Sequence, residues 1–475
     1  MLASEEGLRE AQHYSLSGYR HRDGIVIVGV SAQLELSAVK KLLVGLGILV
    51  VVGVIGFGGL YLIATRYGAL APIQPIEVVT LDPELVEKGE LLAAVGDCAV
   101  CHTREDGEPY AGGLALPTPF GTIYSTNITP DPKTGIGTWS GEAFLRAMHQ
   151  GIDQEGNHLY PAFPYDHFSL VTEEDVAAIY AFLMSQQATE YTPPPNEMPF
   201  PFSFRPVLEG WKILFHRPEV YKADPNHDEE WNRGAYLVAG LGHCGACHTP
   251  RNAFGASEPS KTFGGASAEG WYVPPIGAAS HSPIGWTQNA YLNYLFDGWD
   301  EHHGIAAGPM GPVIDALFEA DEDDVFAMAT YLASLEEPPT DTEIDEAATR
   351  IAALDWAETE RPGGANAPTD TALLRGEQKF FDTCVKCHKA IIAESQPASL
   401  GLSAVVNATV PDNLVHVIVH GIVPPEASPQ RKMEPQGQAL TDAELVDVVN
   451  FVRWRFTDLP DWTGIEAALE HSRAE

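Results

Sequence analysis

Three short stretches of the chain share one arrangement of two cysteines and a histidine. They read Cys98-Ala-Val-Cys101-His102, Cys244-Gly-Ala-Cys247-His248 and Cys384-Val-Lys-Cys387-His388, and together they use all six cysteines. Two thiols three residues apart on a helical turn can each form a thioether with one porphyrin, and the adjacent histidine can then bind the iron. The spacing therefore predicts covalent attachment of haem c.

Other chemistries can use a pair of cysteines at this spacing. A lone Cys-x-x-Cys could be a redox-active dithiol or half of a zinc site. Because all three copies carry the final histidine and no cysteine is left over, we expect three covalently bound haem c groups. Attachment of this kind takes place outside the bacterial cytoplasm, so we expect the bulk of the chain in the periplasm. The predicted proximal iron ligands are His102, His248 and His388.

An electron-transfer haem often has methionine as its second axial ligand, which raises the reduction potential. The chain has only seven methionines. Met310 lies in Gly-Pro-Met-Gly-Pro, 63 residues after Cys247, and Met433 lies 46 residues after Cys387. We predict these two as the distal ligands of the second and third haems.

The first motif has no methionine at the corresponding position. The residue 62 positions after Cys101 is Phe163, which cannot ligate iron. We predict His167, four residues further on, as the distal ligand of the first haem. The alternatives are His158, an iron left open or water-bound, and Met148, which we expect in the core instead.

A long apolar run precedes all three motifs. Residues 42–64 are 23 consecutive residues without a charge, which is enough to span a bilayer. Arg22, Lys40 and Lys41 come before the run and only Arg66 closely follows it, which favours a cytoplasmic N-terminus. We predict a single transmembrane anchor at 39–66. The tripeptide at 69–71 leaves a cleaved signal peptide as an alternative.

The first 38 residues show no convincing periodicity. The sequence from Val39 onward resembles the usual N-terminus of a membrane protein. We therefore interpret 1–38 as an extension that is not translated, with Val39 as initiator. Peptides from residues 1–38 in the purified protein would contradict this.

A helical pattern repeats around the three motifs. A basic residue followed by glycine comes 9 to 11 residues before the first cysteine of each motif. An acidic residue later opens an apolar stripe at helical spacing. The repeat predicts haem-binding units at 76–190, 229–336 and 371–460. Its members are Lys88-Gly89, Arg233-Gly234 and Arg375-Gly376, with helices opening at Asp175, Asp324 and Glu444.

The remaining stretches look like connections. Residues 191–228 are rich in proline and aromatics, which predicts an extended, stiff linker whose aromatics pack on the haem units, with partner contact as the alternative. Residues 337–370 are acidic and predict a solvated linker. Residues 461–475 are expected to be a C-terminal tail.

Composition excludes several functions. The chain has 65 acidic and 28 basic residues, a formal charge of −37, which argues against a nucleic-acid partner. We find no convincing catalytic triad, phosphate-binding loop or pair of catalytic carboxylates. We interpret His243, His302 and His303 as solvent-exposed loop residues and not as a metal site.

Four stretches together resemble one known family. They are Cys98–Thr103, Tyr110-Ala-Gly-Gly113, Pro119–Pro130 and Leu159-Tyr-Pro-Ala162. They are similar to the triple-haem cytochrome c subunits of bacterial membrane-bound dehydrogenases, and the similarity runs from about residue 76 to 457. The resemblance implies a mainly α fold with three tandem class I cytochrome c-like domains after an N-terminal transmembrane helix.

The resemblance also implies a role and partners. Members of this family accept electrons from a periplasmic catalytic subunit and pass them to ubiquinone or a terminal oxidase. Phe163 together with Asp166-His167 looks like the branch that accompanies molybdenum-dependent aldehyde dehydrogenases, which have a molybdopterin catalytic subunit and an iron–sulfur subunit. One alternative is the cytochrome subunit of a quinohaemoprotein alcohol or flavin-dependent gluconate dehydrogenase. A rival of another class is a haem peroxidase or reductase that uses an open first haem.

Overall fold

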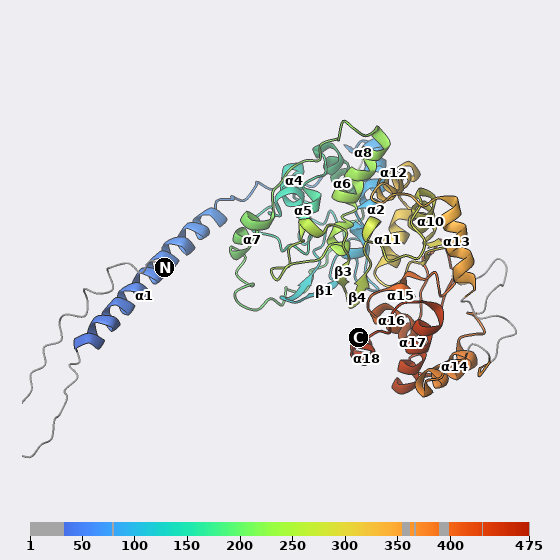
Figure 1. The fold of residues 1–475 in the computed structure, drawn as a ribbon. Helices are drawn as coiled ribbons and strands as arrows, with labels where there is room; N and C mark the ends of the chain where they lie inside the picture. The colour runs from blue at the N-terminus through green and yellow to red at the C-terminus, as the bar shows by residue number, and fades with distance from the viewer. Residues whose placement is uncertain are drawn as a thin grey trace, which may run out of the picture. The chain divides into compact units, whose positions relative to one another are not determined.

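The computed structural model describes residues 33–77, 80–353, 362–364, 367–388, 399–429 and 431–474 (Figure 1). The predicted extension lies outside the described residues as far as residue 32. The chain divides into two compact units, Met1–Leu62 and Ile63–Glu475. The first unit contains most of helix α1 (Gln33–Ala64), in which Lys41–Ala64 is long and apolar enough to cross a membrane. This helix coincides with the predicted anchor.

The second unit is mainly helical, and one pair of packed helices accompanies each Cys-x-x-Cys-His motif. We call α2 with α6 the first pair, α8 with α12 the second pair, and α14 with α17 the third pair. In chain order, the helices from the first pair to the third are α2 (Pro83–Val95), α3 (Cys98–His102), α4 (Gly141–Gln150), α5 (Tyr165–Phe168), α6 (Glu173–Ser185), α7 (Val207–Phe215), α8 (Glu229–Tyr236), α9 (Gly245–His248), α10 (Gln288–Asp297), α11 (Met310–Phe318), α12 (Glu322–Ala333), α13 (Asp341–Ala352), α14 (Thr371–Thr383), α15 (Ala404–Asn407), α16 (Asp412–His420), α17 (Asp442–Phe456) and α18 (Ile465–Ala474).

The two helices of each pair cross at a glycine. A Cβ atom added to that glycine would lie 1.9–2.2 Å from a backbone oxygen of the partner helix, so a larger residue does not fit. The repeated basic-Gly pattern thus has a steric cause in the crossing. The three contacts are Gly89 with Ala178, Gly234 with Ala327, and Gly376 with Asp447.

The basic residue before each glycine forms an ion pair across the same crossing. Lys88 lies 2.8 Å from Asp175 and Arg233 lies 2.6 Å from Asp324, as the alignment of the repeats suggests. The third pair differs, because Arg375 binds Asp447 at 2.7 Å, one helical turn beyond Glu444. The alignment of Glu444 with the other two acids is nevertheless confirmed, because each glycine meets the residue three positions after the aligned acid.

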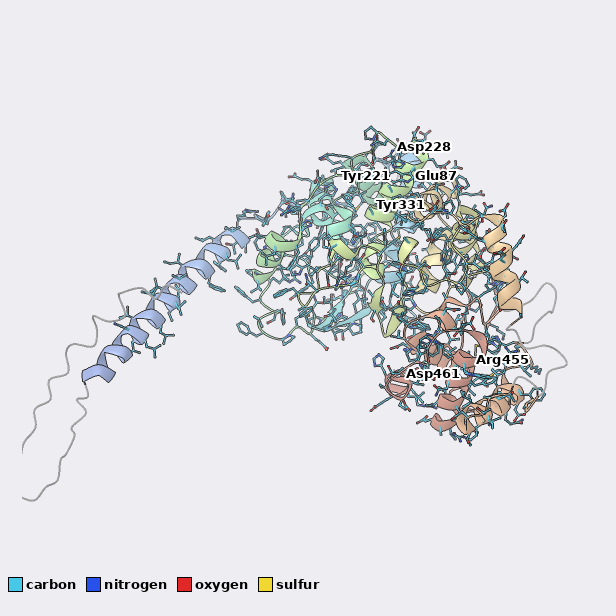
Figure 2. All side chains as sticks on the ribbon, viewed as in Figure 1. Glu87, Tyr221, Asp228, Tyr331, Arg455 and Asp461 are labelled. Carbon is cyan, nitrogen blue, oxygen red and sulfur yellow. The ribbon has the colours of Figure 1, made fainter. Side chains whose placement is uncertain are left out.

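Two hydrophobic clusters hold the pairs. The first and second pairs share one cluster, to which Leu92, Phe182, Leu241 and Met328 contribute. The third pair has a cluster of its own, and Figure 1 shows its helices together with α16 and α18 in the orange-to-red, C-terminal part of the chain. Tyr221 packs on α8, where Figure 2 shows it near Asp228 and Tyr331.

Strands are few among the described residues and form two-stranded antiparallel hairpins. The first hairpin joins β1 (Ala115–Thr118) to β2 (Gly121–Tyr124), with Ala115 opposite Tyr124. The second joins β3 (Ala266–Ala268) to β4 (Trp271–Val273). The third joins β5 (Trp299–Asp300) to β6 (Gly304–Ile305). The mainly helical class is confirmed.

The three connecting stretches are more structured than predicted. Helix α7 lies inside 191–228, where an extended linker was expected. Helix α13 lies inside 337–370. Helix α18 occupies most of the expected tail, and its residues Ile465 and Leu469 are buried. The extended conformation expected for 191–228 was wrong over α7, because proline content describes the average of a stretch and misses short helices that tertiary packing stabilises. The expected packing of its aromatics on the first unit is confirmed by Phe202 against Phe120 and Trp211 against Tyr165.

Candidate haem-attachment sites

A turn of helix carries the first motif and positions its two thiols. Helix α3 begins at Cys98 and ends at His102. Residues at positions i and i+3 lie on one helix face, so Cys98 and Cys101 face the same side. Asp97, just before the helix, has a left-handed backbone (φ 54°) that turns the chain sharply out of α2. The second motif has the same feature at His243 (φ 38°).

Backbone carbonyls fix the histidines of the first two motifs. The Nδ1–H of His102 donates to the Thr126 carbonyl at 2.6 Å, and that of His248 donates to the Pro274 carbonyl at 2.7 Å. This bond leaves Nε2 with a free lone pair and orients the ring, which is how a metal-ligating histidine is usually held. Burial also lowers the pKa of His102, His248 and His388, which favours the neutral form needed by a ligand.

The third histidine is held differently. The Nδ1 atom of His388 is buried and has no hydrogen-bond partner among the described residues. Cys384 directly follows α14, and its N–H bonds to the Phe380 carbonyl at 2.7 Å, which continues the helix into the motif.

The electrostatics of the thiols do not fit a redox dithiol. Burial raises the pKa of four of the cysteines to about 12, whereas the reactive cysteine of a redox pair needs a lowered pKa. A zinc site finds no support either, because no ligand cluster occurs in the part of the chain that the structure describes. The side chains therefore fit covalent haem attachment better than either alternative. The four cysteines are Cys98, Cys101, Cys244 and Cys384.

The first two motifs lie next to each other in space. A Cβ atom on Gly96 would lie 3.3 Å from the Cys98 sulfur and 3.0 Å from Leu241, which is three residues before the second motif. Cys247 also lies close enough to contribute to the raised pKa of Cys101, after burial and nearby acids. Groups attached at these two motifs would thus be neighbours, as electron transfer between them requires.

The two predicted distal methionines lie in ordered positions. Met310 is the first residue of α11 and packs against the cluster shared by the first and second pairs. Met433 is held by two backbone hydrogen bonds to Ile422, of 2.8 and 3.2 Å, and packs against the cluster of the third pair.

His167, the predicted distal ligand at the first motif, lies against the second motif. Its Nδ1 is 2.8 Å from the Ala239 carbonyl oxygen. A Cβ atom on Gly245, inside the second motif, would lie 3.0 Å from its Cε1 and 3.8 Å from its Nε2. Phe163 packs on Phe168, with ring centroids 5.3 Å apart. The ligand of the first haem stays a prediction.

The other two side chains considered for this role are buried. His158 places its Nε2 3.0 Å from the Ala64 carbonyl oxygen, and burial, with a smaller effect of nearby Lys212, lowers its pKa to about 4. Met148 lies in the core of the first pair, as expected.

One expectation about histidines was wrong. His303 is 4% exposed, not a solvent-exposed loop residue. Its Nδ1 lies 2.7 Å from Asp300, and its ring stacks on Trp286 at 3.7 Å. His243 is also partly shielded and stacks on Phe168. Asp300 lies only three residues before His303, but the stacking rings and the carbonyls that orient His102 and His248 come from distant segments, of which the sequence around each histidine gives no sign.

Comparison with known proteins agrees with this geometry. Residues 86–187 match the family model described as cytochrome c, and residues 371–452 match the model described as cytochrome c oxidase, cbb3-type, subunit III. Both matched ranges contain a Cys-x-x-Cys-His motif. The cytochrome c fold implies covalent haem c at these motifs.

Three relatives are similar over most of the chain. A nicotinate dehydrogenase subunit of Pseudomonas putida is 41% identical over 410 residues, which cover 85% of this chain and 33% of the relative, so this chain spans about a third of its length. The cytochrome c subunit of alcohol dehydrogenase (quinone) of Komagataeibacter europaeus is 35% identical, covering 82% of this chain and 84% of the relative. The fructose dehydrogenase cytochrome subunit of Gluconobacter japonicus is 34% identical, covering 81% and 82%. The chain belongs to the family of cytochrome c subunits of membrane-bound dehydrogenases.

Proposed function

We propose that the chain relays electrons from a catalytic subunit through three c-type haems to ubiquinone or a terminal oxidase, without catalysis of its own. Its three cytochrome c-like domains are 76–190, 229–336 and 371–460. The protein sets each haem's potential through the axial ligand, burial and hydrogen bonds, while the haem carries the electron.

One observation carries this proposal: the Cys-x-x-Cys-His motif occurs three times, each time beside a helix pair that crosses at a glycine. The second motif lies outside the ranges of the two family models, yet its helix pair has the same glycine crossing and the same ion pair as the first. A third haem site between the two matched regions is therefore consistent with the packing. We assign His102, His248 and His388 as proximal ligands, Met310 and Met433 as distal ligands, and His167 as the distal ligand of the first haem.

The proposed partner is a molybdopterin catalytic subunit with an iron–sulfur subunit, of the aldehyde dehydrogenase type. Support comes from the resemblance at Phe163 and Asp166-His167, and from the 41% identity to a nicotinate dehydrogenase subunit against 35% and 34% for the alcohol and fructose relatives. Nicotinate is a nitrogen heterocycle, so the proposal includes molybdenum-dependent dehydrogenases that act on N-heterocycles. The alternative is a quinohaemoprotein alcohol or flavin-dependent gluconate dehydrogenase.

The proposed location is the bacterial inner membrane, with one N-terminal span and the haem domains in the periplasm. Support comes from the apolar stretch Lys41–Ala64 and from the haem-attachment motifs that follow it.

Copurification from the native membrane tests the proposal. We expect the isolated complex to contain molybdenum and iron–sulfur clusters, and a pyridine haemochrome assay to give three haems for each copy of this chain. Flavin or pyrroloquinoline quinone in place of molybdenum would contradict the partner. Two haems per chain would contradict the proposed number of haems but would not affect the proposed partner.

A further inference from the structure

Helix α7 buries two charged side chains and exposes two large apolar ones. Its inward face carries Leu208, Glu209 and Lys212, all buried, with His216 buried just beyond the last residue of the helix. Its outward face carries Ile213, which is 58% exposed, and Leu214, which is 69% exposed. A helix on a water-facing surface normally turns its apolar side inward. The orientation of α7 therefore leaves large apolar side chains exposed beside a buried lysine and glutamate.

Specific hydrogen bonds hold α7 in this orientation. The Nζ of Lys212 donates to the carbonyls of Gln150 (2.6 Å) and Gly151 (2.7 Å), which are the end of α4 and its cap. The His216 ring bonds to the His149 carbonyl at 2.9 Å. Rotation of the helix to bury Ile213 would break these bonds, so the exposure of the apolar face is built into the packing.

Aromatic side chains extend the exposed face beyond the helix. Phe254, on a loop of the second pair, is 66% exposed, and its ring lies 5.9 Å from that of Phe215. Trp211 donates its indole N–H to the Phe254 carbonyl at 3.0 Å, which ties the loop to α7. We call Ile213, Leu214, Phe215 and Phe254 the outer α7 patch. Aromatics with a polar anchor of this kind are typical of the membrane–water interface.

The residues that directly follow the apolar stretch of α1 contact the inner face of α7. Ala64, the last residue of that stretch, is buried and accepts a hydrogen bond from His158. Arg66, two residues later, lies 3.5 Å from Glu209 on the inner face of α7. The chain is thus fixed to α7 at the point where it would leave a bilayer.

We propose that α7 lies in the interface of the membrane and inserts the outer α7 patch among the lipid acyl chains. The proposal rests on the proposed membrane attachment and adds a second contact to it. Burial of the apolar face in lipid explains an orientation that is unfavourable in water. With α1 and α7 both attached, the haem domains have a defined orientation towards the bilayer instead of hanging from a single tether.

Lipid crosslinking to the full-length haem protein tests the contact. The protein would be placed in vesicles of phosphatidylethanolamine and phosphatidylglycerol that contain a phospholipid with a diazirine in its acyl chain. After illumination and trypsin digestion, we expect lipid adducts on the peptides 42–66 and 213–222, because trypsin does not cut between Arg217 and Pro218. Adducts on 42–66 alone would overturn the proposal and leave the anchor intact. Adducts on 213–222 alone would support the proposal and contradict the anchor, and adducts on neither would overturn both.

Thiol accessibility gives an independent measurement. Leu214→Cys is compared with Val423→Cys, a site that is 87% exposed and far from α7 in the sequence. We expect a water-soluble maleimide to react about tenfold more slowly at position 214 in vesicles, since a low dielectric disfavours the reactive thiolate. Equal rates would overturn the proposal. Protection of position 214 only after addition of the catalytic subunit would also overturn it and would assign the patch to a protein partner.

Discussion

The hydroxyl of Tyr236 donates a hydrogen bond of 2.7 Å to the buried carboxylate of Asp175 and so joins the first and second helix pairs. Lys88 and Arg233 reach the same carboxylate at 2.8 and 3.5 Å. Burial opposes ionisation of Asp175, but the hydrogen bonds from Lys88 and Tyr236 outweigh it and lower the pKa of the carboxyl. One buried carboxylate thus connects the first helix pair to the second.

Replacement of Tyr236 by phenylalanine should weaken this junction. The change removes the bond to Asp175 and leaves the Thr172 N–H, which bonds to the same hydroxyl at 3.1 Å, without its partner. We expect a loss of about 2 kcal/mol in the free energy of unfolding, measured by urea titration at the haem absorbance band. Tyr124→Phe, whose hydroxyl only reaches exposed Glu197 at 3.4 Å, is the control and should change stability by about 0.5 kcal/mol or less.

The glycine crossing predicts that the same glycine-to-alanine change affects stability very differently at two sites. In Gly234→Ala, the new Cβ would lie 1.9 Å from the Ala327 backbone oxygen, so α8 and α12 must separate. We expect the free energy of unfolding to fall by about 1–3 kcal/mol and the yield of haem-loaded protein to be lower. Gly141→Ala, at the start of α4, would meet only the Tyr180 ring at 4.0 Å and should be neutral or slightly stabilising. Equal effects at both sites would show that the crossing is looser than described.

The parts of the fold that the sequence predicted are those with a local pattern. The Cys-x-x-Cys-His motifs, the basic-Gly pairs and the apolar stripes need only a few neighbouring residues to be recognised. Features that depend on distant segments were missed: the burial of His303 against Trp286, the pairing of Arg375 with Asp447, and the burial of charged side chains on α7. Each of these is set by which elements meet in space, and a single sequence does not contain that information.

Lys212 should make stability depend on pH. Burial lowers its pKa from 10.5 to about 7, against a smaller opposing effect of Glu209. Between pH 7 and 10.5 the unfolded chain holds a proton on this lysine that the folded chain has lost, so stability rises with pH. The slope from this one group is at most about 1.4 kcal/mol per pH unit. We expect Lys212→Met to be less stable overall but to lack this rise, as measured by urea titration from pH 7 to 9.5.

A surface lysine provides the control for this measurement. Lys133 is exposed and pairs with exposed Glu190 at 2.8 Å. Lys133→Met should keep the slope of the unmodified protein. If Lys212→Met keeps that slope as well, Lys212 is charged in the folded protein throughout this range.

The distal ligand of the first haem can be tested at His167. Its Nδ1 bonds to the Ala239 carbonyl, which leaves Nε2 free for iron. If His167 is the ligand, His167→Ala should convert one haem from low spin to high spin, as seen by electron paramagnetic resonance of the oxidised protein. His158→Ala is the comparison, since the His158 Nε2 already bonds to Ala64, and its spectrum should stay low spin.

Two outcomes would change the assignment of the first haem. An unchanged spectrum in His167→Ala would remove His167 from consideration. Stoichiometric binding of carbon monoxide to one haem of the reduced, unmodified protein would indicate an open iron and would favour the peroxidase or reductase alternative.

Met433 offers a test that separates one haem from the others. Imidazole stabilises the oxidised iron more than thioether does, so Met433→His should lower the reduction potential of the third haem alone. We expect a shift on the order of 0.1 V, a fraction of the roughly 0.8 V that axial ligands span. Met148→Leu, in the core of the first pair, is the matched control and should leave all potentials in place. A redox titration in which Met433→His also moves none of the potentials would show that this methionine does not bind iron.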